Sequence, residues 1–163
     1  RIAWFKVHKP IYYYASYFSI RCNDFDIETM CAGYDAIKKK FDEINDAGFD
    51  AKNKEASLRD ELQLTMEMYK RGISFKMIDL NKSDAKNFII DDDGKSLIFP
   101  FRGLDGLGDN VARAIVEERE KGAFISIEDV AMRAKVNSTT IEKMKMLHIF
   151  DGMPESNQLS LFD

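Results

Sequence analysis

The stretch Leu104-Asp105-Gly106-Leu107-Gly108 decides how we interpret the fold of this chain. Two glycines flank one aliphatic residue, and an amphipathic helix is predicted to begin directly afterwards. Because glycine has no Cβ, such a turn can bring main-chain N–H groups close to a phosphate. The first N–H groups of the following helix, and its dipole, would favour the negative charge. The stretch therefore predicts a phosphate-binding hairpin, with a simple turn before a helix as the alternative.

A second hairpin is predicted further along the chain. The helix after the first hairpin is expected to end at Lys121-Gly122, and Ser126 has the spacing of a cap for a helix that runs to about Ala134. The turn Lys135-Val136-Asn137 leads to a last helix, for which Thr139 is the predicted cap. The order of these elements predicts two tandem helix-hairpin-helix motifs, the second without glycines.

The first 21 residues of the chain are rich in aromatic side chains and also contain several basic residues. Pro10 suits the first turn of a helix, on which Tyr14 and Phe18 would share one face. We favour an aromatic core completed by helices upstream of Arg1. A nucleic-acid surface that mixes aromatic and basic side chains is the alternative.

Two longer helices are predicted between this segment and Gly72. Asp26 would cap one that continues to about Gly48, and Ser57 with Asp60 would open the other. The glycines at the two ends are typical of helix termination.

A small β element is predicted between the helical regions. The runs Phe88–Ile90 and Leu97–Phe99 flank Asp91-Asp92-Asp93-Gly94, which reads as a hairpin loop, and residues 73–80 lean toward β structure. A Ca²⁺ loop needs alternating ligands and a distant Glu, whereas contiguous aspartates before a glycine are turn residues. We therefore predict no metal site here.

The composition of the chain excludes several classes of protein. The chain has 163 residues, of which 45% are hydrophobic and 32% charged, with a formal net charge of −4. This charge argues against DNA binding by bulk electrostatics, so any nucleic-acid contact must come from the local arrangement of residues.

The cysteines and histidines (Cys22, Cys31, His8, His148) have no metal-site spacing, which indicates reduced cysteines in a cytoplasmic protein. No apolar run approaches membrane-spanning length, and the first residue, Arg1, suggests that the chain begins inside a larger protein.

The last residues carry an apolar peptide after a polar stretch. Residues 152–157 are expected to be a flexible linker, and Gln158-Leu159-Ser160-Leu161-Phe162 contains three large apolar residues. Exposed apolar residues on a tether indicate a docking peptide. Folding back onto the chain's own domain is the alternative.

Together these features resemble the C-family replicative DNA polymerases of bacteria, nearest the PolC type of DNA polymerase III alpha subunit in low-GC Gram-positive species. The block 103–151 resembles their tandem helix-hairpin-helix, duplex-binding region. The run His8-Lys9-Pro10-Ile11-Tyr12-Tyr13-Tyr14-Ala15-Ser16-Tyr17-Phe18 resembles the late fingers region. The peptide 158–162 is similar to the one by which bacterial replication proteins bind the sliding clamp.

The resemblance implies a DNA-directed DNA polymerase as the parent enzyme, with a nucleotidyltransferase activity. Palm aspartates of that family hold two Mg²⁺ ions, and nothing in this sequence resembles the palm. We therefore expect no catalytic residue, cofactor or metal in this chain, which should not polymerise alone. The implied partners are primer–template duplex DNA, the sliding clamp and the rest of the polymerase chain, in the bacterial cytoplasm and away from the membrane.

The resemblance also implies site residues. The expected DNA-binding residues are Gly106, Leu107, Gly108, Asn110 and Arg113 in the first hairpin, and Lys135, Val136, Asn137, Ser138 and Thr139 in the second. Leu107 and Val136 are expected to pack inside their hairpins. The expected clamp-binding residues are Gln158, Leu159, Ser160, Leu161 and Phe162, with Gln158 hydrogen-bonding and Leu161 and Phe162 as apolar anchors.

The predicted fold is mainly α with a small β-hairpin: a helical fingers segment followed by tandem helix-hairpin-helix motifs. The expected divisions are residues 1–72, 73–102, 103–151 and 152–163. A helical protein-interaction module without DNA binding of its own is the competing function, favoured by the acidic balance. A repair nuclease or glycosylase would need a catalytic Asp or Lys in a pocket beside the hairpin. Asp105 and Asp109 are available but are explained as helix-start residues.

Overall fold

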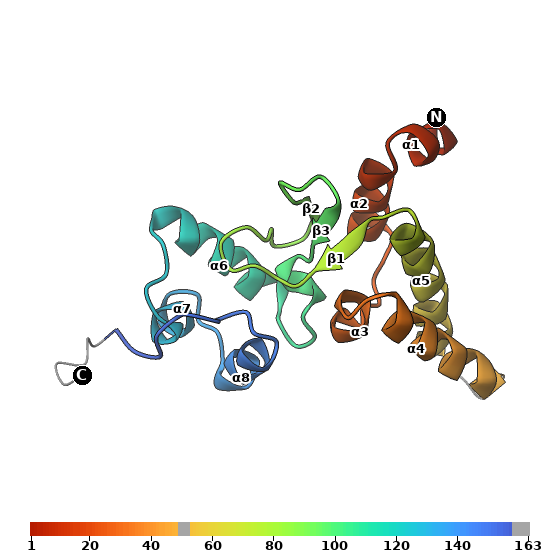
Figure 1. The fold of residues 1–163 in the computed structure, drawn as a ribbon. Helices are drawn as coiled ribbons and strands as arrows, with labels where there is room; N and C mark the ends of the chain where they lie inside the picture. The colour runs from red at the N-terminus through yellow and green to blue at the C-terminus, as the bar shows by residue number, and fades with distance from the viewer. Residues whose placement is uncertain (49–52, 158–163) are drawn as a thin grey trace. The chain divides into compact units, whose positions relative to one another are not determined.

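A computed structural model describes residues 1–48 and 53–157 of the chain, which divides into two compact units. Unit 1 comprises Arg1–Met77 and Asn87–Phe99, and unit 2 comprises Ile78–Lys86 and Pro100–Asp163. Figure 1 shows that helices dominate both and that unit 1 also holds a small sheet. The predicted class, mainly α with a small β element, is confirmed.

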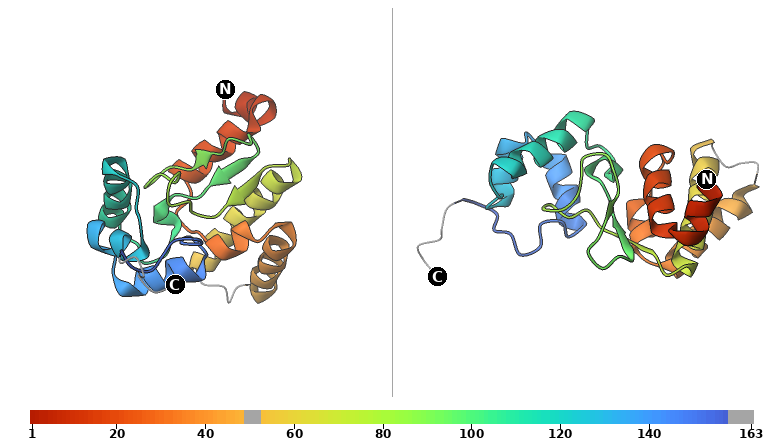
Figure 2. Two further views of the ribbon diagram at one scale, coloured as in Figure 1. Left: turned by 60° about the vertical axis from the view of Figure 1, so that its left-hand side comes forward. Right: turned by 90° about the horizontal axis from the view of Figure 1, so that it is seen from above.

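The helices of unit 1 precede its sheet. They are α1 (Ile2–His8), α2 (Pro10–Ile20), α3 (Ile27–Cys31), α4 (Tyr34–Ala47) and α5 (Asn53–Lys70). Pro10 occupies the first turn of α2 as predicted, because its missing N–H costs nothing there. Helices α4 and α5 pack side by side (Figures 1 and 2).

Two helix starts differ from the sequence-based expectation. Asp26 does cap a helix, since its carboxylate accepts from the Thr29 N–H at 3.2 Å, but that helix is the short α3. Gly33 then takes a φ of +109°, a left-handed conformation that interrupts the single helix predicted from Asp26 to about Gly48 and separates α3 from α4. Helix α5 begins at Asn53, so Ser57 lies inside the helix rather than at its start.

The sheet contains the predicted hairpin and one additional strand. Strands β2 (Ile89–Ile90) and β3 (Ser96–Ile98) pair antiparallel, which confirms the hairpin. Strand β1 (Ser74–Lys76) pairs parallel with the other edge of β3, and the strand order is β1-β3-β2. A parallel pair needs a crossover connection, and local sequence gives no sign of which distant strand it will join.

The core of unit 1 is an aromatic cluster. The rings of Phe18 and Phe75 lie 4.9 Å apart, and those of Phe75 and Phe99 lie 4.7 Å apart. Tyr14 and Phe18 are fully buried, so the core interpretation of the aromatic segment is confirmed for these two residues. The expectation that helices upstream of Arg1 complete this core is wrong for Phe18, because its ring packs against Phe75 and Phe88 of this chain. Burying several rings in edge-to-face contact stabilises a unit that has only a small sheet.

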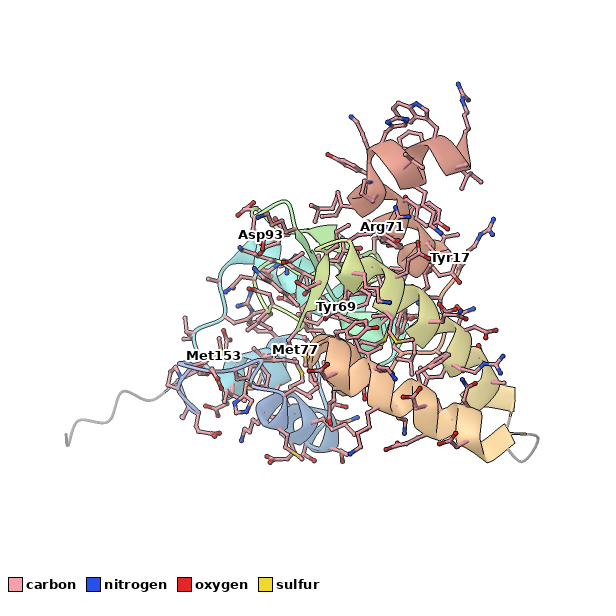
Figure 3. The ribbon with its side chains drawn as sticks, turned by 45° about the vertical axis from the view of Figure 1, so that its right-hand side comes forward. Tyr17, Tyr69, Arg71, Met77, Asp93 and Met153 are labelled. Atoms are coloured by element: carbon pink, nitrogen blue, oxygen red, sulfur yellow. The ribbon has the colours of Figure 1, made fainter. Side chains whose placement is uncertain are left out.

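Tyr69, at the end of α5, joins three elements of unit 1 (Figure 3). Its hydroxyl donates to the carbonyl oxygen of Met30 at 2.6 Å and accepts from the Phe75 N–H at 3.2 Å. One side chain therefore satisfies two main-chain groups that would otherwise be buried without a partner.

The hairpin loop of the sheet is held by Asp93, labelled in Figure 3. Its carboxylate accepts from the Lys95 N–H at 2.8 Å and from the Ser96 hydroxyl at 2.7 Å, and Lys76 lies 3.3 Å away. These hydrogen bonds and the lysine lower the pKa of Asp93 to about 2. The aspartate acts here as a turn residue.

Unit 2 contains the short 3-10 helix η2 (Phe101–Gly103) and the helices α6 (Asp109–Lys121), α7 (Ile127–Arg133) and α8 (Ser138–Met146). Phe101, Ile115, Val130 and Met144 are fully buried between them. Ser126 caps α7 as predicted, since its hydroxyl accepts from the Asp129 N–H at 3.0 Å.

The predicted element 73–102 is divided between the two units. Its strands belong to unit 1, whereas residues 78–86 belong to unit 2. Arg119 of α6 explains the attachment, because its guanidinium donates to the carbonyl oxygens of Leu80 at 3.0 Å and Ser83 at 2.8 Å.

Residues 153–157, which we call the strap, also differ from expectation. Instead of a free linker, the strap runs back along α7, as Figure 1 shows for the blue segment after α8, and Figure 3 labels Met153 at its start. The Ile127 N–H donates to the Pro154 carbonyl oxygen at 2.9 Å, and the Glu128 N–H donates to that of Glu155 at 3.0 Å. The first main-chain donors of α7 thus find acceptors in the strap.

Candidate nucleic-acid interface

The first hairpin is a tight turn closed within Leu104–Gly108. The Leu107 N–H donates to the Leu104 carbonyl oxygen at 3.2 Å, and Gly106 has a φ of +88°. A residue with a Cβ rarely adopts this conformation, so the backbone itself favours glycine at this position. Leu107 is only 7% exposed and packs inward, as predicted.

Gly108 has a different role, because the fold does not require glycine there. Its φ of −69° is ordinary, and a Cβ built on it would meet nothing within 4 Å. It is the N-cap of α6, whose first internal hydrogen bond runs from the Ala112 N–H to the Gly108 carbonyl oxygen at 3.0 Å. Because Gly108 has no side chain, the N-cap residue supplies no side-chain acceptor for the first N–H groups of α6. The helix start therefore presents open main-chain donors next to a position without a side chain, which suits close approach by an anion.

The second hairpin follows the same backbone course without glycine. Lys135 has a φ of +55° where the first hairpin has Gly106, and Val136 is 7% exposed like Leu107. Asn137 has φ −72° and ψ 160°, close to the −69° and 154° of Gly108. The tandem arrangement predicted from the sequence is thus visible residue by residue.

The two hairpins differ in how the helix that follows is capped. Asn137 caps α8 through its own side chain, which accepts from the Thr140 N–H at 2.8 Å. The prediction that Thr139 would be the cap is therefore wrong, because the cap lies two residues earlier, at Asn137, and the helix begins at Ser138. One donor of α8 is already satisfied, so the start of α6 is the more open of the two.

Helix α7 enters the second hairpin through a Schellman ending. The Val136 N–H donates to the Ala131 carbonyl oxygen at 3.2 Å, and Lys135 takes the left-handed position that glycine usually fills. A lysine held in this conformation carries some backbone strain and points a cation out of the turn, since its side chain is exposed.

The predicted side-chain contacts of the first hairpin lie on the first turns of α6. The Arg113 guanidinium donates to the Asn110 side-chain oxygen at 2.7 Å, and both residues are exposed. Ser138 and Thr139 are exposed at the start of α8 in the second hairpin. These residues are accessible to a ligand, and their assignment as DNA contacts stays a prediction.

Lys143 belongs to the site, although the sequence did not predict it. From α8 its ammonium donates to the Asp105 carbonyl oxygen at 3.1 Å, and it lies 3.4 Å from where a Cβ on Gly106 would sit. It therefore adds a cation to the first hairpin from the helix of the second. The two residues are 38 positions apart, so no local spacing could have connected them.

Several basic residues of the block 103–151 are engaged in structural contacts. The block has seven basic and nine acidic residues. Arg133 pairs with Asp129 at 3.2 Å and stacks 4.6 Å from the centre of the Phe124 ring. Lys121 pairs with Glu118 on the same helix. Arg113, Lys135 and Lys143 are the basic residues at the hairpins, so any grip on a phosphate depends largely on main-chain donors.

The aromatic segment of unit 1 also borders a groove. Its volume is about 790 Å³, and aromatic and basic side chains line it, among them Lys9, Tyr12, Tyr13, Tyr17 and Arg21. Burial, followed by the nearby Glu61, raises the pKa of Tyr17 to about 12, so its hydroxyl stays protonated at neutral pH. The structure thus divides this segment between the core of unit 1 and an accessible surface.

The clamp-binding prediction for residues 158–162 lies outside the described residues. Within the described residues, no helix has both the length and the apolar character needed to cross a membrane.

Comparison with known proteins agrees with the hairpin geometry. The helix-hairpin-helix motif family matches residues 72–159, more than half of the chain, and the chain belongs to this family. The chain is 50% identical over its whole length to a DNA polymerase III PolC-type from Lacticaseibacillus paracasei and to one from Lactococcus lactis. It is 48% identical over 99% of its length to the protein of that name from Listeria monocytogenes. The chain spans only 10–11% of the length of these relatives.

Proposed function

We propose that this chain is the part of a bacterial replicative DNA polymerase that holds product duplex DNA and tethers the enzyme to the sliding clamp. The relatives named DNA polymerase III PolC-type support the proposal, since the similarity extends over the whole chain. On this proposal residues 1–72 form part of the fingers, and the protein works at the replication fork in the bacterial cytoplasm.

The hairpins would hold DNA through its backbone. The open N–H groups at the start of α6 bind one phosphate oxygen, while Lys143 and Arg113 contribute positive charge. The second hairpin meets another phosphate with the exposed start of α8 and with Lys135. Contacts to phosphates position a protein without reading sequence, which suits an enzyme that must copy any template.

Gly108 is the observation that carries the DNA-binding part of the proposal. Its backbone is ordinary and its Cβ position is empty, so neither strain nor packing explains the glycine. Close approach of a ligand to the helix start does explain it, because any side chain there would stand between the N–H groups and a phosphate.

The clamp contact would be made by residues 158–162, with Leu161 and Phe162 filling an apolar pocket. A short peptide binds weakly alone because it loses conformational freedom on docking. Connected to a duplex-binding unit, it acts at a high effective concentration. Processive synthesis would follow from the product of the two affinities.

The chemistry of nucleotide addition belongs, on this proposal, to other parts of the polymerase. Mg²⁺ would activate the primer hydroxyl there. The residues described by the structure do not fit such a site, since no group of three or more His, Cys, Asp or Glu side chains among them could hold a metal ion. We expect no DNA synthesis by this chain alone.

The test is fluorescence anisotropy of a labelled primer–template duplex titrated with the chain across a salt series. We expect saturable binding without sequence preference and a shallow salt slope, because few cations displace counterions. Gly108→Ala should weaken binding about tenfold, given the net strength of a hydrogen bond to a charged group. Gly122→Ala is the matched control at the other end of α6, where a Cβ also meets nothing within 4 Å.

A helical protein-interaction module is the second candidate, favoured by the excess of acidic residues in the block 103–151. It predicts clamp binding with no duplex affinity even at low salt. Equal duplex binding by Gly108→Ala and the unchanged chain would contradict the hairpin assignment.

A further inference from the structure

The strap is fixed to unit 2 at both of its ends. At its beginning, the Met153 N–H donates to the Phe150 carbonyl oxygen at 2.9 Å. In its middle, the carbonyl oxygens of Pro154 and Glu155 accept from the first N–H groups of α7. Lys145 of α8 also forms an ion pair with the Glu155 carboxylate at 3.0 Å. The strap thus contacts both helices that flank the second hairpin.

Glu128 holds the end of the strap. One of its carboxylate oxygens, Oε2, accepts from the Ser156 hydroxyl at 3.0 Å and from the Asn157 N–H at 3.1 Å. A single side chain of α7 therefore fixes two successive residues, through one side-chain donor and one main-chain donor.

Ser126 adds a second attachment beside it. Its hydroxyl accepts from the Asp129 N–H at 3.0 Å and donates to the side-chain oxygen of Asn157. Ser126 is fully buried, so its hydroxyl would lose an acceptor in a dry environment if the strap left. Leaving a buried donor unpaired costs free energy, which favours the attached state.

We propose that the strap is a presenting element: Glu128 and Ser126 fix the chain at Ser156 and Asn157, immediately before Gln158. The inference rests on the proposed function, because it concerns how the clamp-binding peptide is offered. Glu128 is a positioning residue on this proposal and touches neither DNA nor the clamp.

The physical advantage is a fixed geometry between the hairpins and the peptide. A free linker over residues 152–157 would leave the position of the peptide undefined. The root-mean-square end-to-end distance of a flexible chain of this length is about 13 Å. A pinned strap removes that spread, so the peptide starts from one place relative to both hairpins. On this proposal that place faces the clamp, so preorganisation raises the effective concentration for the second contact.

Release of the strap can be tested first without any partner. Amide hydrogen exchange followed by NMR should show protection at Ile127, Glu128 and Asn157 in the unchanged chain. Glu128→Ala should speed exchange at Asn157 about three- to tenfold, a local opening rather than unfolding. Glu117→Ala is the matched control, since it removes another exposed carboxylate from a helix of unit 2.

A second variant leaves α7 unchanged, in case Glu128→Ala disturbs the start of that helix. Glu155→Ala with Ser156→Ala removes the Lys145 pair and the Ser156 donor from the strap itself. It should release the strap to a similar extent.

The closing experiment compares clamp binding with and without DNA, using the whole chain and purified sliding clamp. Clamp loaded on a primer–template duplex should bind both strap variants about three- to tenfold more weakly than the unchanged chain, through lost preorganisation. Clamp alone should bind all chains equally, because residues 158–162 are unaltered, and the Glu117→Ala control should match the unchanged chain throughout.

The outcomes separate the two proposals. Equal or tighter binding of a released strap variant to clamp on DNA overturns the presenting role while the clamp contact stands. The same holds if exchange shows no protection in the unchanged chain. Failure of the unchanged chain to bind clamp at all overturns the clamp part of the proposed function and this inference with it.

Discussion

Lys143 of α8 donates a hydrogen bond to the carbonyl oxygen of Asp105 at 3.1 Å, and so connects the helix of the second hairpin to the loop of the first. The contact joins two motifs whose signals in the sequence are separate. It also places a cation where the acidic side chains Asp105 and Asp109 would otherwise dominate.

Replacing Lys143 with Met keeps the aliphatic length but removes the hydrogen bond and the charge. Duplex affinity should fall several-fold, and the slope of log K against log salt should decrease by about one, because one fewer counterion is released. Stability should change by less than about 1 kcal/mol, since the side chain is exposed. Anisotropy and urea unfolding measure the two effects. Lys121→Met is the control, and an unchanged salt slope for Lys143→Met would exclude a phosphate contact.

The two glycines of the first hairpin should respond differently to alanine. Gly106→Ala introduces a Cβ at a backbone φ of +88° and places it 3.4 Å from the Lys143 ammonium. We therefore expect the free energy of unfolding to fall by about 1–2 kcal/mol. Gly108→Ala should cost less than about 1 kcal/mol, because its backbone is ordinary and its surroundings are empty. Urea unfolding ranks them, and the reverse order would contradict the turn geometry.

Lys135→Gly should separate stability from binding. Glycine adopts the left-handed conformation at φ +55° without strain, so the free energy of unfolding should rise by up to about 1 kcal/mol. Duplex affinity should nevertheless fall, since the cation is lost. His148→Gly is the matched control, because His148 follows the C-cap of α8 with a φ of +61°. This variant should gain stability without a change in DNA binding. Parallel losses of affinity in both variants would point to the backbone rather than the charge.

The cap of α8 can be assigned by substitution. Asn137→Ala should destabilise the chain by about 1 kcal/mol, since the Thr140 N–H loses its acceptor. Thr139→Ala should cost less than about 0.5 kcal/mol at an exposed helical position. Thermal and urea unfolding of both variants test this, and a larger effect at Thr139 would restore the original cap assignment.

The hairpin of unit 1 should respond to acid through Asp93. The folded state lowers the pKa of this carboxyl from 3.8 to about 2, so its ionised form contributes stability above the unfolded value. That contribution is lost as the pH falls from about 4 toward 2. Asp93→Asn should therefore be less stable at pH 7, and the difference should shrink over this acid range. Urea unfolding at several pH values measures it, and a constant difference would exclude the carboxylate as the cause.

Much of the fold followed from local signals in the sequence. Ser126 caps its helix, Gly48 and Gly122 follow the last residues of theirs, and Pro10 begins α2, because capping and termination depend on residues a few positions apart. The errors were local as well. Gly33 divides what was predicted as one helix into α3 and α4, and Asn137 rather than Thr139 caps α8.

The sequence predicted those parts of the candidate site whose residues lie within a few positions of one another. It missed the part that depends on residues far apart in the chain. Both hairpins were recognisable from a turn, a buried aliphatic residue and a helix start. Lys143 was not, because its contact with Asp105 depends on how α8 packs within unit 2.

By itself, therefore, the sequence determined the helical character, the tandem hairpins and the β2–β3 turn, since short-range spacing of apolar, capping and turn residues specifies each of them. Only the tertiary structure decided that β1 joins β3 in parallel, that Lys143 reaches Asp105, and that the strap lies on α7. These contacts join residues far apart in the chain. They form because the packing of whole helices and strands brings these groups within hydrogen-bond distance, which local spacing along the sequence does not specify.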